Sequence, residues 1–436
     1  MAQTGIDGHD RPQDVKQPDR PKLLQILGPG LITGASDDDP SGIATYSQAG
    51  AQFGYDLGWT LLFSWPLMCA IQEISARIGR VTGHGVAGNL KRHYPAGLLY
   101  PIVLLLMAAN IINLGADLGA MASALGLLIK GPQWLFVVIF AALSLGLEVF
   151  LRYARYVSVL KWLTLSLFAY VGVVLVAKAP WAEVGRHLIM PNVSFQSGYL
   201  TVVVAVLGTT ISPYLFFWQA EEEVEEVRED PKAQPLSRAP EQAKREFRRI
   251  RIDTMVGMAF SNIVALSIVI ATAATLHAHG TTNIQTSAQA AEALRPICGP
   301  LVFLVFALGI IGTGMLAVPV LAGSAAYALG EVLGVQVGLA RKVRRAKAFY
   351  AILALIVVAG AALNFTPIDP IKALFWSAVI NGVVAVPVMA MMMLMASRKK
   401  VMGRFVLSAP LRVIGWTATL VMAAAAIGMF ATGAAG

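Results

Sequence analysis

The sequence predicts an all-α integral membrane protein with about eleven spans of roughly 20 residues each. The composition is 56% hydrophobic and only 14% charged, with a mean hydropathy of +0.65. Long apolar segments recur along the whole chain, and 40 glycines suit closely packed membrane helices. These observations exclude an ordinary soluble domain, and two cysteines provide no disulfide framework.

The apolar segments define the expected helices. Residues 1–22 are polar and are expected to form a cytoplasmic tail without a cleavable signal peptide. Residues 23–436 are expected to form a single transmembrane domain. The expected helices are 23–50, 54–78, 96–129, 133–150, 156–177, 198–221, 253–277, 298–330, 347–364, 368–395 and 411–433.

The basic residues are distributed unevenly between the two sides of this topology. Of the 34 Lys and Arg residues, 29 fall on the side that carries the N-terminus. Positive charge gathers on the cytoplasmic side of membrane proteins, so we expect a multi-pass protein of the cell membrane with a cytoplasmic N-terminus. The net charge of +9 is therefore topological, and we expect no nucleic-acid partner. The hydrophilic connection 222–252 is expected to form a solvated cytoplasmic helix end, a loop and an entry helix; an acidic vestibule for cations is the alternative.

The first expected helix contains three adjacent carboxylates, Asp37, Asp38 and Asp39, followed by Pro40 and Gly42. Charges near the bilayer midplane are costly and usually functional. The proline removes a backbone donor and the glycine frees the chain, so a helix break is expected here. A broken membrane helix with carboxylates at its break indicates a cation site in a transporter.

The sixth expected helix contains a second irregularity, the stretch from Gly208 through Thr209 and Ser212 to Pro213. An ordinary proline kink is the simpler alternative. The two irregularities are five spans apart, however, as expected for two inverted five-helix halves. Two facing breaks would offer oxygen ligands, which suit Mg²⁺, Ca²⁺ or Mn²⁺. Neither break contains His or Cys, which argues against a tetrahedral zinc or copper site.

At these residues the chain resembles the Nramp (natural resistance-associated macrophage protein) family of divalent-metal transporters. The resemblance implies a LeuT-like fold of two inverted five-helix halves, about 23–177 and 198–395, with an eleventh helix at about 411–433. It also implies alternating access at a site between helices 1 and 6. The matching segments are Gly28-Pro29-Gly30, the helix 1 break, Gln52 to Tyr55, Gln72 to Gly79, Val81-Thr82-Gly83, the helix 3 region and Gly208 to Pro213.

The resemblance assigns site residues by position. The family's Asp-Pro-Gly-Asn motif corresponds to Asp39, Pro40, Ser41 and Gly42, so the aspartate ligand is kept and the asparagine ligand is lost. The family's Ala-x-x-Met-Pro-His motif corresponds to the run from Thr209 to Tyr214. Here the implied ligands are the Thr209 carbonyl and Ser212, which replaces the methionine, while Tyr214 replaces the histidine. Of the family's helix 3 acidic pair, Asp117 remains and the other position is Leu114.

These departures favour a hard ion. A thioether selects transition metals, whereas Ser212 and the additional carboxylates Asp37 and Asp38 make a wetter, oxygen-lined site. The chain thus resembles the magnesium-transporting branch of Nramp-related proteins, and the hypothesis is uptake of Mg²⁺, with Mn²⁺ also carried. The loss of the histidine and of one helix 3 acid predicts uptake that is not coupled to protons.

Further polar residues are candidates for the surroundings of the site or the ion pathway. Asn113 and Asp117 are one helical turn apart and can face one groove. An interhelical hydrogen-bond network is the alternative. Asn381 is expected near the ion, with Gly382 interrupting helix 10 beside it. Tyr214 and Thr210 complete this set.

Three other functions are compatible with parts of the sequence. A proton-coupled Mn²⁺/Fe²⁺ transporter of the ordinary Nramp type is the main alternative. An amino-acid symporter of the same fold is disfavoured, because three aspartates would repel a substrate carboxylate. An intramembrane aspartyl protease using Asp39 and Asp117 lacks the motifs of that class, so the protein is not expected to be an enzyme. Expected partners are the metal ion and the bilayer, with no cofactor and no obligate protein partner.

Overall fold

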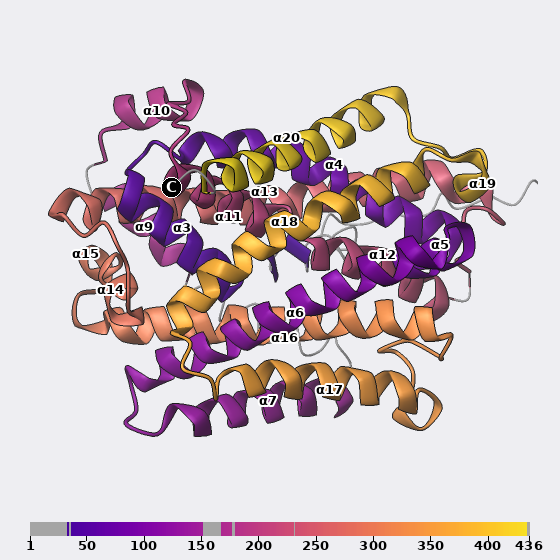
Figure 1. The fold of residues 1–436 in the computed structure, drawn as a ribbon, viewed down its shortest axis with the longest axis horizontal. Helices are drawn as coiled ribbons and strands as arrows, with labels where there is room; N and C mark the ends of the chain where they lie inside the picture. The colour runs from indigo at the N-terminus through magenta and orange to yellow at the C-terminus, as the bar shows by residue number, and fades with distance from the viewer. Residues whose placement is uncertain (1–32, 35, 151–166, 177–178, 231, 434–436) are drawn as a thin grey trace, which may run out of the picture.

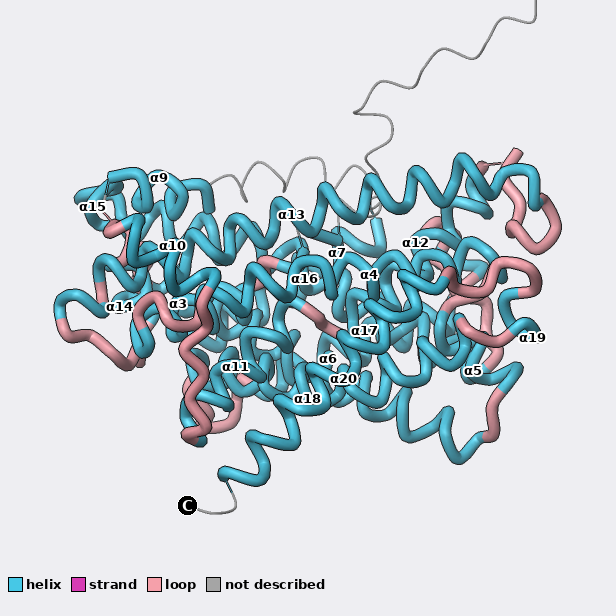
Figure 2. Tube along the Cα trace, turned by 90° about the horizontal axis from the view of Figure 1, so that it is seen from above, coloured by secondary structure: helices cyan, strands magenta, loops and turns pink. Residues whose placement is uncertain are grey.

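The computed structural model describes residues 33–34, 36–150, 167–176, 179–230 and 232–433, and these form helices and loops without a strand (Figure 1 and Figure 2). The helices lie largely along one common direction, as expected of membrane spans. The expected tail 1–22 lies outside the described residues, as does most of the expected helix 156–177.

The first half is a broken helix followed by regular ones. Its first helix runs to Asp37 and resumes as α3 (Pro40–Phe53). The remaining elements are α4 (Gly58–Thr82), α5 (Val86–His93), α6 (Ala96–Gly126), α7 (Gln133–Phe150) and α9 (Phe168–Val176).

The second half repeats this order after the short helix α10 (Trp181–Ile189). Its first helix is also divided, into α11 (Ser197–Thr210) and α12 (Pro213–Glu229). The longer elements that follow are α13 (Ala243–Thr275), α16 (Val302–Leu333), α17 (Lys347–Leu363), α18 (Pro370–Ala396) and α20 (Ala409–Gly433). Short helices lie between them: α14 (Ser287–Glu292), α15 (Arg295–Cys298) and α19 (Lys399–Met402).

The packing between the halves is reciprocal. The first helix of one half packs on the second helix of the other, as α3 on α13 and α12 on α4. The third helices of the halves, α6 and α16, pack against each other at the centre, and α17 and α7 lie outside them (Figure 1). Both divided helices pack against several other helices: α3 lies against α13 and α18, α11 against α18 and α3, and α12 against α4 and α16.

Seven of the described helical segments are long and apolar enough to cross a membrane. They are Ala96–Gly126, Gln133–Phe150, Ser197–Glu229, Pro240–His279, Arg295–Leu333, Pro370–Ala396 and Ala409–Gly433; the apolar α17 is shorter, at 17 residues.

Two sequence expectations about helix bounds are wrong. The helix expected at 253–277 begins ten residues earlier, at Ala243, because its polar first turns are held by ion pairs. Arg249 there contacts Glu223 at 2.5 Å, Glu226 at 2.9 Å and Glu246 at 3.0 Å. The expected interruption at Gly382 is absent, since α18 runs unbroken and this glycine instead packs closely against the backbone of α11.

That close approach of α11 and α18 leads to a stability prediction. A Cβ at Gly208 would overlap the carbonyl of Ala378 and the backbone of Gly382. We expect Gly208→Ala to lower the free energy of unfolding by about 1–3 kcal/mol through overpacking. Gly146→Ala in α7 is the matched control, because a Cβ there meets open space and Ala favours a helix. Thermal unfolding in detergent measures both; equal melting temperatures would contradict the prediction.

Candidate functional site

The first helix breaks at Asp38 and Asp39, as the sequence predicts. Asp39 has an extended backbone (φ −67°, ψ 169°), and Pro40 occupies the first turn of α3, where a missing N–H costs no helical hydrogen bond. The Asp39 carboxylate caps α3 by accepting a hydrogen bond from the Gly42 amide at 2.6 Å. Its charge therefore lies at the positive end of the α3 dipole.

The second carboxylate oxygen of Asp39 contacts two further helices, and a third is reached through Asn113. It accepts a hydrogen bond from the Asn113 amide of α6 at 2.9 Å and lies 3.4 Å from the Tyr214 hydroxyl of α12. The Asn113 side-chain carbonyl in turn accepts a hydrogen bond from Ser377 of α18 at 2.8 Å. Asp39 is only 2% exposed, so this carboxylate is an anionic centre inside the protein.

Asp37 and Asp38 point to a different helix. The Ser261 hydroxyl of α13 lies 2.6 Å from one Asp37 oxygen and 3.2 Å from one Asp38 oxygen. Both carboxylates are buried, and the other Asp37 oxygen has no hydrogen-bond partner. Over the described ranges no three His, Cys, Asp or Glu side chains converge as a preformed metal cluster. The aspartates thus occupy two sides of the break: Asp39 towards α6 and α12, and the other two towards α13.

The second break lies at Ile211 and Ser212, between α11 and α12. Like the first, it is followed by a proline at the start of the next helix. The Ser212 hydroxyl lies 2.7 Å from the carbonyls of both Gly208 and Thr209, so it donates its hydrogen bond to the carbonyl groups at the end of α11. The Thr210 hydroxyl donates within its own helix, to Val206 at 3.1 Å.

The two broken helices are joined through tyrosines. The hydroxyls of Thr209 and Tyr46 lie 3.0 Å apart, which links α11 to α3. The Tyr214 hydroxyl donates to the Ser36 carbonyl at 3.2 Å, which links α12 to the last turn before the first break. The residues at the two breaks therefore form one connected region.

Two other predicted residues are buried with unpartnered polar atoms. Neither carboxylate oxygen of Asp117, which is fully buried, has a hydrogen-bond partner. The side-chain oxygen of Asn381 is also unpartnered. Gln72 of α4, in a segment that carries the family resemblance, has both amide atoms unpartnered. Buried polar atoms need a hydrogen-bonding partner, so these residues are candidates for contact with water or an ion.

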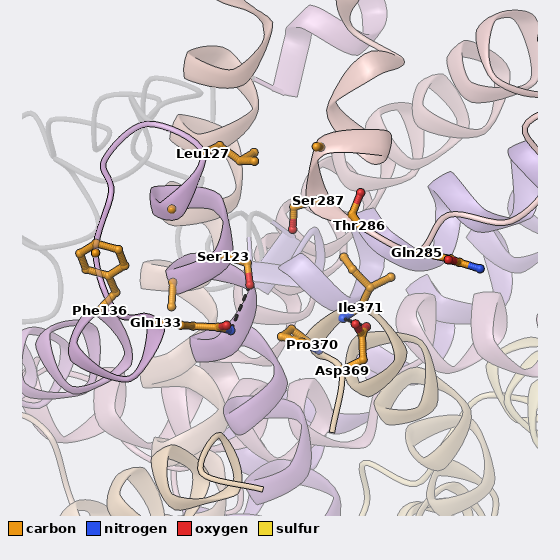
Figure 3. Close-up of a pocket in the computed structure, with 14 residues that line it drawn as sticks. Ser123, Leu127, Gln133, Phe136, Gln285, Thr286, Ser287, Asp369, Pro370 and Ile371 are labelled. Atoms are coloured by element: carbon orange, nitrogen blue, oxygen red, sulfur yellow. Dashed lines mark hydrogen bonds between the residues drawn. The ribbon is translucent and has the colours of Figure 1, made fainter. Parts of the chain in front are cut away.

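A cavity lies away from the breaks (Figure 3), beside α14 at the end of the bundle opposite α5 and α19 (Figure 1). Its volume is about 430 Å³, and α6, α14 and the start of α18 contribute to its wall. The labelled side chains Ser123, Gln133 and Thr286 give it a polar lining. A much narrower cavity, lined by Pro40, Ile43, Phe306 and Ile310 among others, lies beside the first break. Because this cavity is narrow and its wall is mostly apolar, it forms a constriction next to the break.

Sequence reasoning missed three residues around the site: Tyr46, Ser261 and Ser377. Tyr46 lies seven residues after Asp39, two helical turns along the same face, so its spacing was a usable signal. The serines are isolated polar residues in apolar spans, and only the packing of α13 and α18 against α3 and α6 brings them to the break.

Solved structures share this architecture. An Eremococcus coleocola manganese transporter superposes with a TM-score of 0.70 at 18% identity, covering 94% of this chain and 87% of that one. MhsT in complex with L-phenylalanine superposes with a TM-score of 0.62 at 11% identity, covering 92% and 98%. These likenesses confirm the predicted LeuT-like fold of two inverted halves with an additional helix.

Sequence comparison identifies relatives along most of the chain. A divalent metal cation transporter MntH from Burkholderia ambifaria is 25% identical over 408 residues, covering 92% of this chain and 87% of the relative. One from Deinococcus radiodurans is 24% identical over 411 residues, covering 92% and 88%. The family model for natural resistance-associated macrophage protein-like sequences matches residues 30–432. The chain therefore belongs to the Nramp family, whose members are membrane transporters of divalent metals and not enzymes.

Proposed function

We propose that this protein carries Mg²⁺, and also Mn²⁺, into the cell by alternating access at the two helix breaks, without coupling to protons. The observation that carries the proposal is the chemistry of the breaks. Asp39 presents a buried carboxylate there, and the other candidate donors, Thr209 and Ser212, offer a carbonyl and a hydroxyl. Such oxygen donors suit hard cations.

Ser212 supports a partly hydrated ion. Its hydroxyl is bonded back to α11, so a ligand role requires a rotation of this short side chain. Without that rotation, water fills the position where the family's thioether would coordinate. Mg²⁺ releases its waters reluctantly and usually keeps several of them in protein sites. Asp37 and Asp38 add negative charge to the same break, which further favours a divalent cation.

The direction of transport follows from the orientation. With the basic loops in the cytoplasm, the large polar cavity lies on the outer side and the narrow cavity beside Pro40 lies between it and the break. An ion therefore reaches the site from outside when the constriction opens. A doubly charged ion gains about 4.6 kcal/mol across 100 mV, inside negative, which drives accumulation without a coupled proton.

The main alternative is a proton-coupled transporter of Mn²⁺ or Fe²⁺. The relatives named divalent metal cation transporter MntH and the Eremococcus coleocola manganese transporter support the divalent class and keep Mn²⁺ among the substrates. Asp117 favours the alternative, because its buried, unpartnered carboxyl is able to take up a proton. Against it stand Tyr214 and Leu114 at the positions of the missing histidine and acid.

Flux in proteoliposomes decides between these functions. With Mg²⁺, Mn²⁺ and Ca²⁺ supplied separately and in competition, we expect Mg²⁺ uptake that Mn²⁺ inhibits, driven by an inside-negative potential. A pH indicator trapped in the vesicles should show no acidification during uptake. Uptake of Mn²⁺ or Fe²⁺ without Mg²⁺ flux or competition would rule out the proposed substrate, and strong acidification would establish the proton-coupled alternative.

A further inference from the structure

A second acidic contact lies at the basic end of the protein, where α12, α16 and α5 meet (Figure 1). Glu331 of α16 holds the beginning of α5 by accepting hydrogen bonds from the Gly85 amide at 3.0 Å and the Gly88 amide at 2.6 Å. Glu221 of α12 reaches the same place: a Cβ on Gly85 would overlap a Glu221 carboxyl oxygen and lie 2.8 Å from a Glu331 carboxyl oxygen. The two carboxyl groups are therefore immediate neighbours, close enough to share a hydrogen bond. This contact therefore joins three elements through two acidic side chains.

The contact requires a proton. Two ionised carboxylates are both acceptors, so a hydrogen bond between them forms only when one is protonated. Glu221 is 2% exposed and Glu331 is half-buried, so bulk water solvates the pair poorly. If both were ionised at this distance, their charges would repel in a poorly solvated environment. A closed arrangement of this region thus binds one more proton than an arrangement in which the two side chains part.

The contact also lies where the molecule must open. Glu221 belongs to one group of helices, in which α12 packs on α4. Glu331 belongs to a second group of helices, in which α16 packs on α6 and α17. Alternating access, on which this inference rests, requires these groups to separate at the cytoplasmic end before the ion leaves. We propose that one proton shared by Glu221 and Glu331 latches this end closed, so that the cytoplasmic proton concentration sets how readily it opens.

The charged neighbours leave the acid pair as the titrating element. On α12, Arg228 lies 3.1 Å from Glu225 and 3.3 Å from the Val337 carbonyl, and its charge also favours the ionised forms of Glu221 and Glu331. On α5, the Lys91 ammonium contacts the backbone carbonyl of Glu331 at 3.3 Å. Burial, followed by nearby arginines, lowers the pKa of His84 to about 4, so this imidazole stays neutral in the relevant range. His93, at the far end of α5, lies 3.0 Å from the Asn89 carbonyl.

The sign of the pH effect follows directly. Because the closed state holds the additional proton, acidification of the cytoplasmic side favours closure and alkalinisation favours opening. The proton is a regulator in this scheme: it binds and leaves from one side and does not cross the membrane. The latch is therefore compatible with uptake that carries no protons.

The test measures the opening without a metal ion. One spin label is placed at Arg92→Cys on α5, which Glu331 ties to α16, and the other at Glu229→Cys on α12. In a background free of Cys69 and Cys298, the pair reports the distance between the two groups of helices. Between about pH 6 and about pH 8.5 we expect the distribution to move to longer distances. Glu221→Gln should stay at the short distance throughout, because its amide donates to Glu331 without a titratable proton. Glu221→Ala should stay at the long distance.

Controls separate the latch from general effects of charge. Glu241→Gln removes an exposed carboxylate from the same cytoplasmic connection and should keep the wild-type profile, as should His93→Gln. In vesicles with clamped internal pH, Mg²⁺ flux should rise about fivefold over the same range in the wild type and stay low in Glu221→Gln. A Glu221→Gln distance profile that follows pH like the wild type would overturn the latch. If the distances changed with pH as expected but no Mg²⁺ flux were found, the proposed substrate would be contradicted and the latch would not.

Discussion

Asp39→Ala should abolish detectable binding of divalent cations, weakening it by at least about 100-fold, or about 2.7 kcal/mol. Asp39 lies at the junction of four helices, and its carboxylate is the charge nearest the start of α3. Removing it leaves Asn113 and Tyr214 as neutral groups, which do not repay the dehydration of a divalent ion. Isothermal titration calorimetry with Mn²⁺ and Mg²⁺ on purified protein measures the loss.

Loss of a helix cap is a separate effect and needs its own control. Asp39→Ala also removes the hydrogen bond to Gly42, which costs about 0.5–2 kcal/mol of stability. Asp369→Ala is the matched variant: Asp369 caps α18 through the Ile371 and Lys372 amides, with a proline at the same position of the helix. It should lose similar stability and keep binding. If Asp39→Ala bound the ions like wild type, the site would lie elsewhere.

Combining Ser212→Met with Gly42→Asn should shift transport from Mg²⁺ towards Mn²⁺. These changes restore the thioether and the amide of the family's two motifs, and a thioether favours transition metals over Mg²⁺. We expect the ratio of Mn²⁺ to Mg²⁺ flux to rise about tenfold, equivalent to about 1.4 kcal/mol. Competitive uptake of the two ions in proteoliposomes gives this ratio in one experiment.

The single variants show which break contributes the selectivity. A Cβ at Gly42 would lie 3.3 Å from both the Asp37 carbonyl and the Tyr46 ring, so Asn fits only with a small adjustment of that ring. Ser212→Met alone should therefore provide most of the shift, and the two changes should be coupled because both groups face one ion. An unchanged flux ratio in the double variant would show that neither position coordinates the ion.

Much of the fold was accessible from the sequence, because local chemistry determines it. Pro40 and Pro213 mark the two helix breaks, and both begin new helices in the structure. Apolar length predicted most spans to within a few residues. The exceptions are informative: the start of α13 is polar, and its ion pairs with α12 involve residues more than twenty positions apart. Hydropathy carries no signal for such a contact.

The site was less accessible, because the directions of side chains depend on the packing of distant helices. The sequence suggested one cluster of three aspartates, whereas Asp39 faces α6 and α12 and the other two face Ser261. The backbone turns sharply at the break, so adjacent residues project to different helices. The orientation of the Ser212 hydroxyl towards the end of α11 could not be predicted from the sequence either. In this orientation the bond to a preceding carbonyl competes with a role as ion ligand.

The central claim is that an oxygen-lined site between the two helix breaks holds the transported ion. Anomalous diffraction from crystals grown with Mn²⁺ locates the ion directly. The account predicts a peak between α3 and α12 within about 2.0–2.6 Å of an Asp39 carboxylate oxygen, and its loss in crystals of Asp39→Ala. A peak confined to the outer cavity, or one beside Ser261 with Asp39 beyond coordination distance, would contradict it.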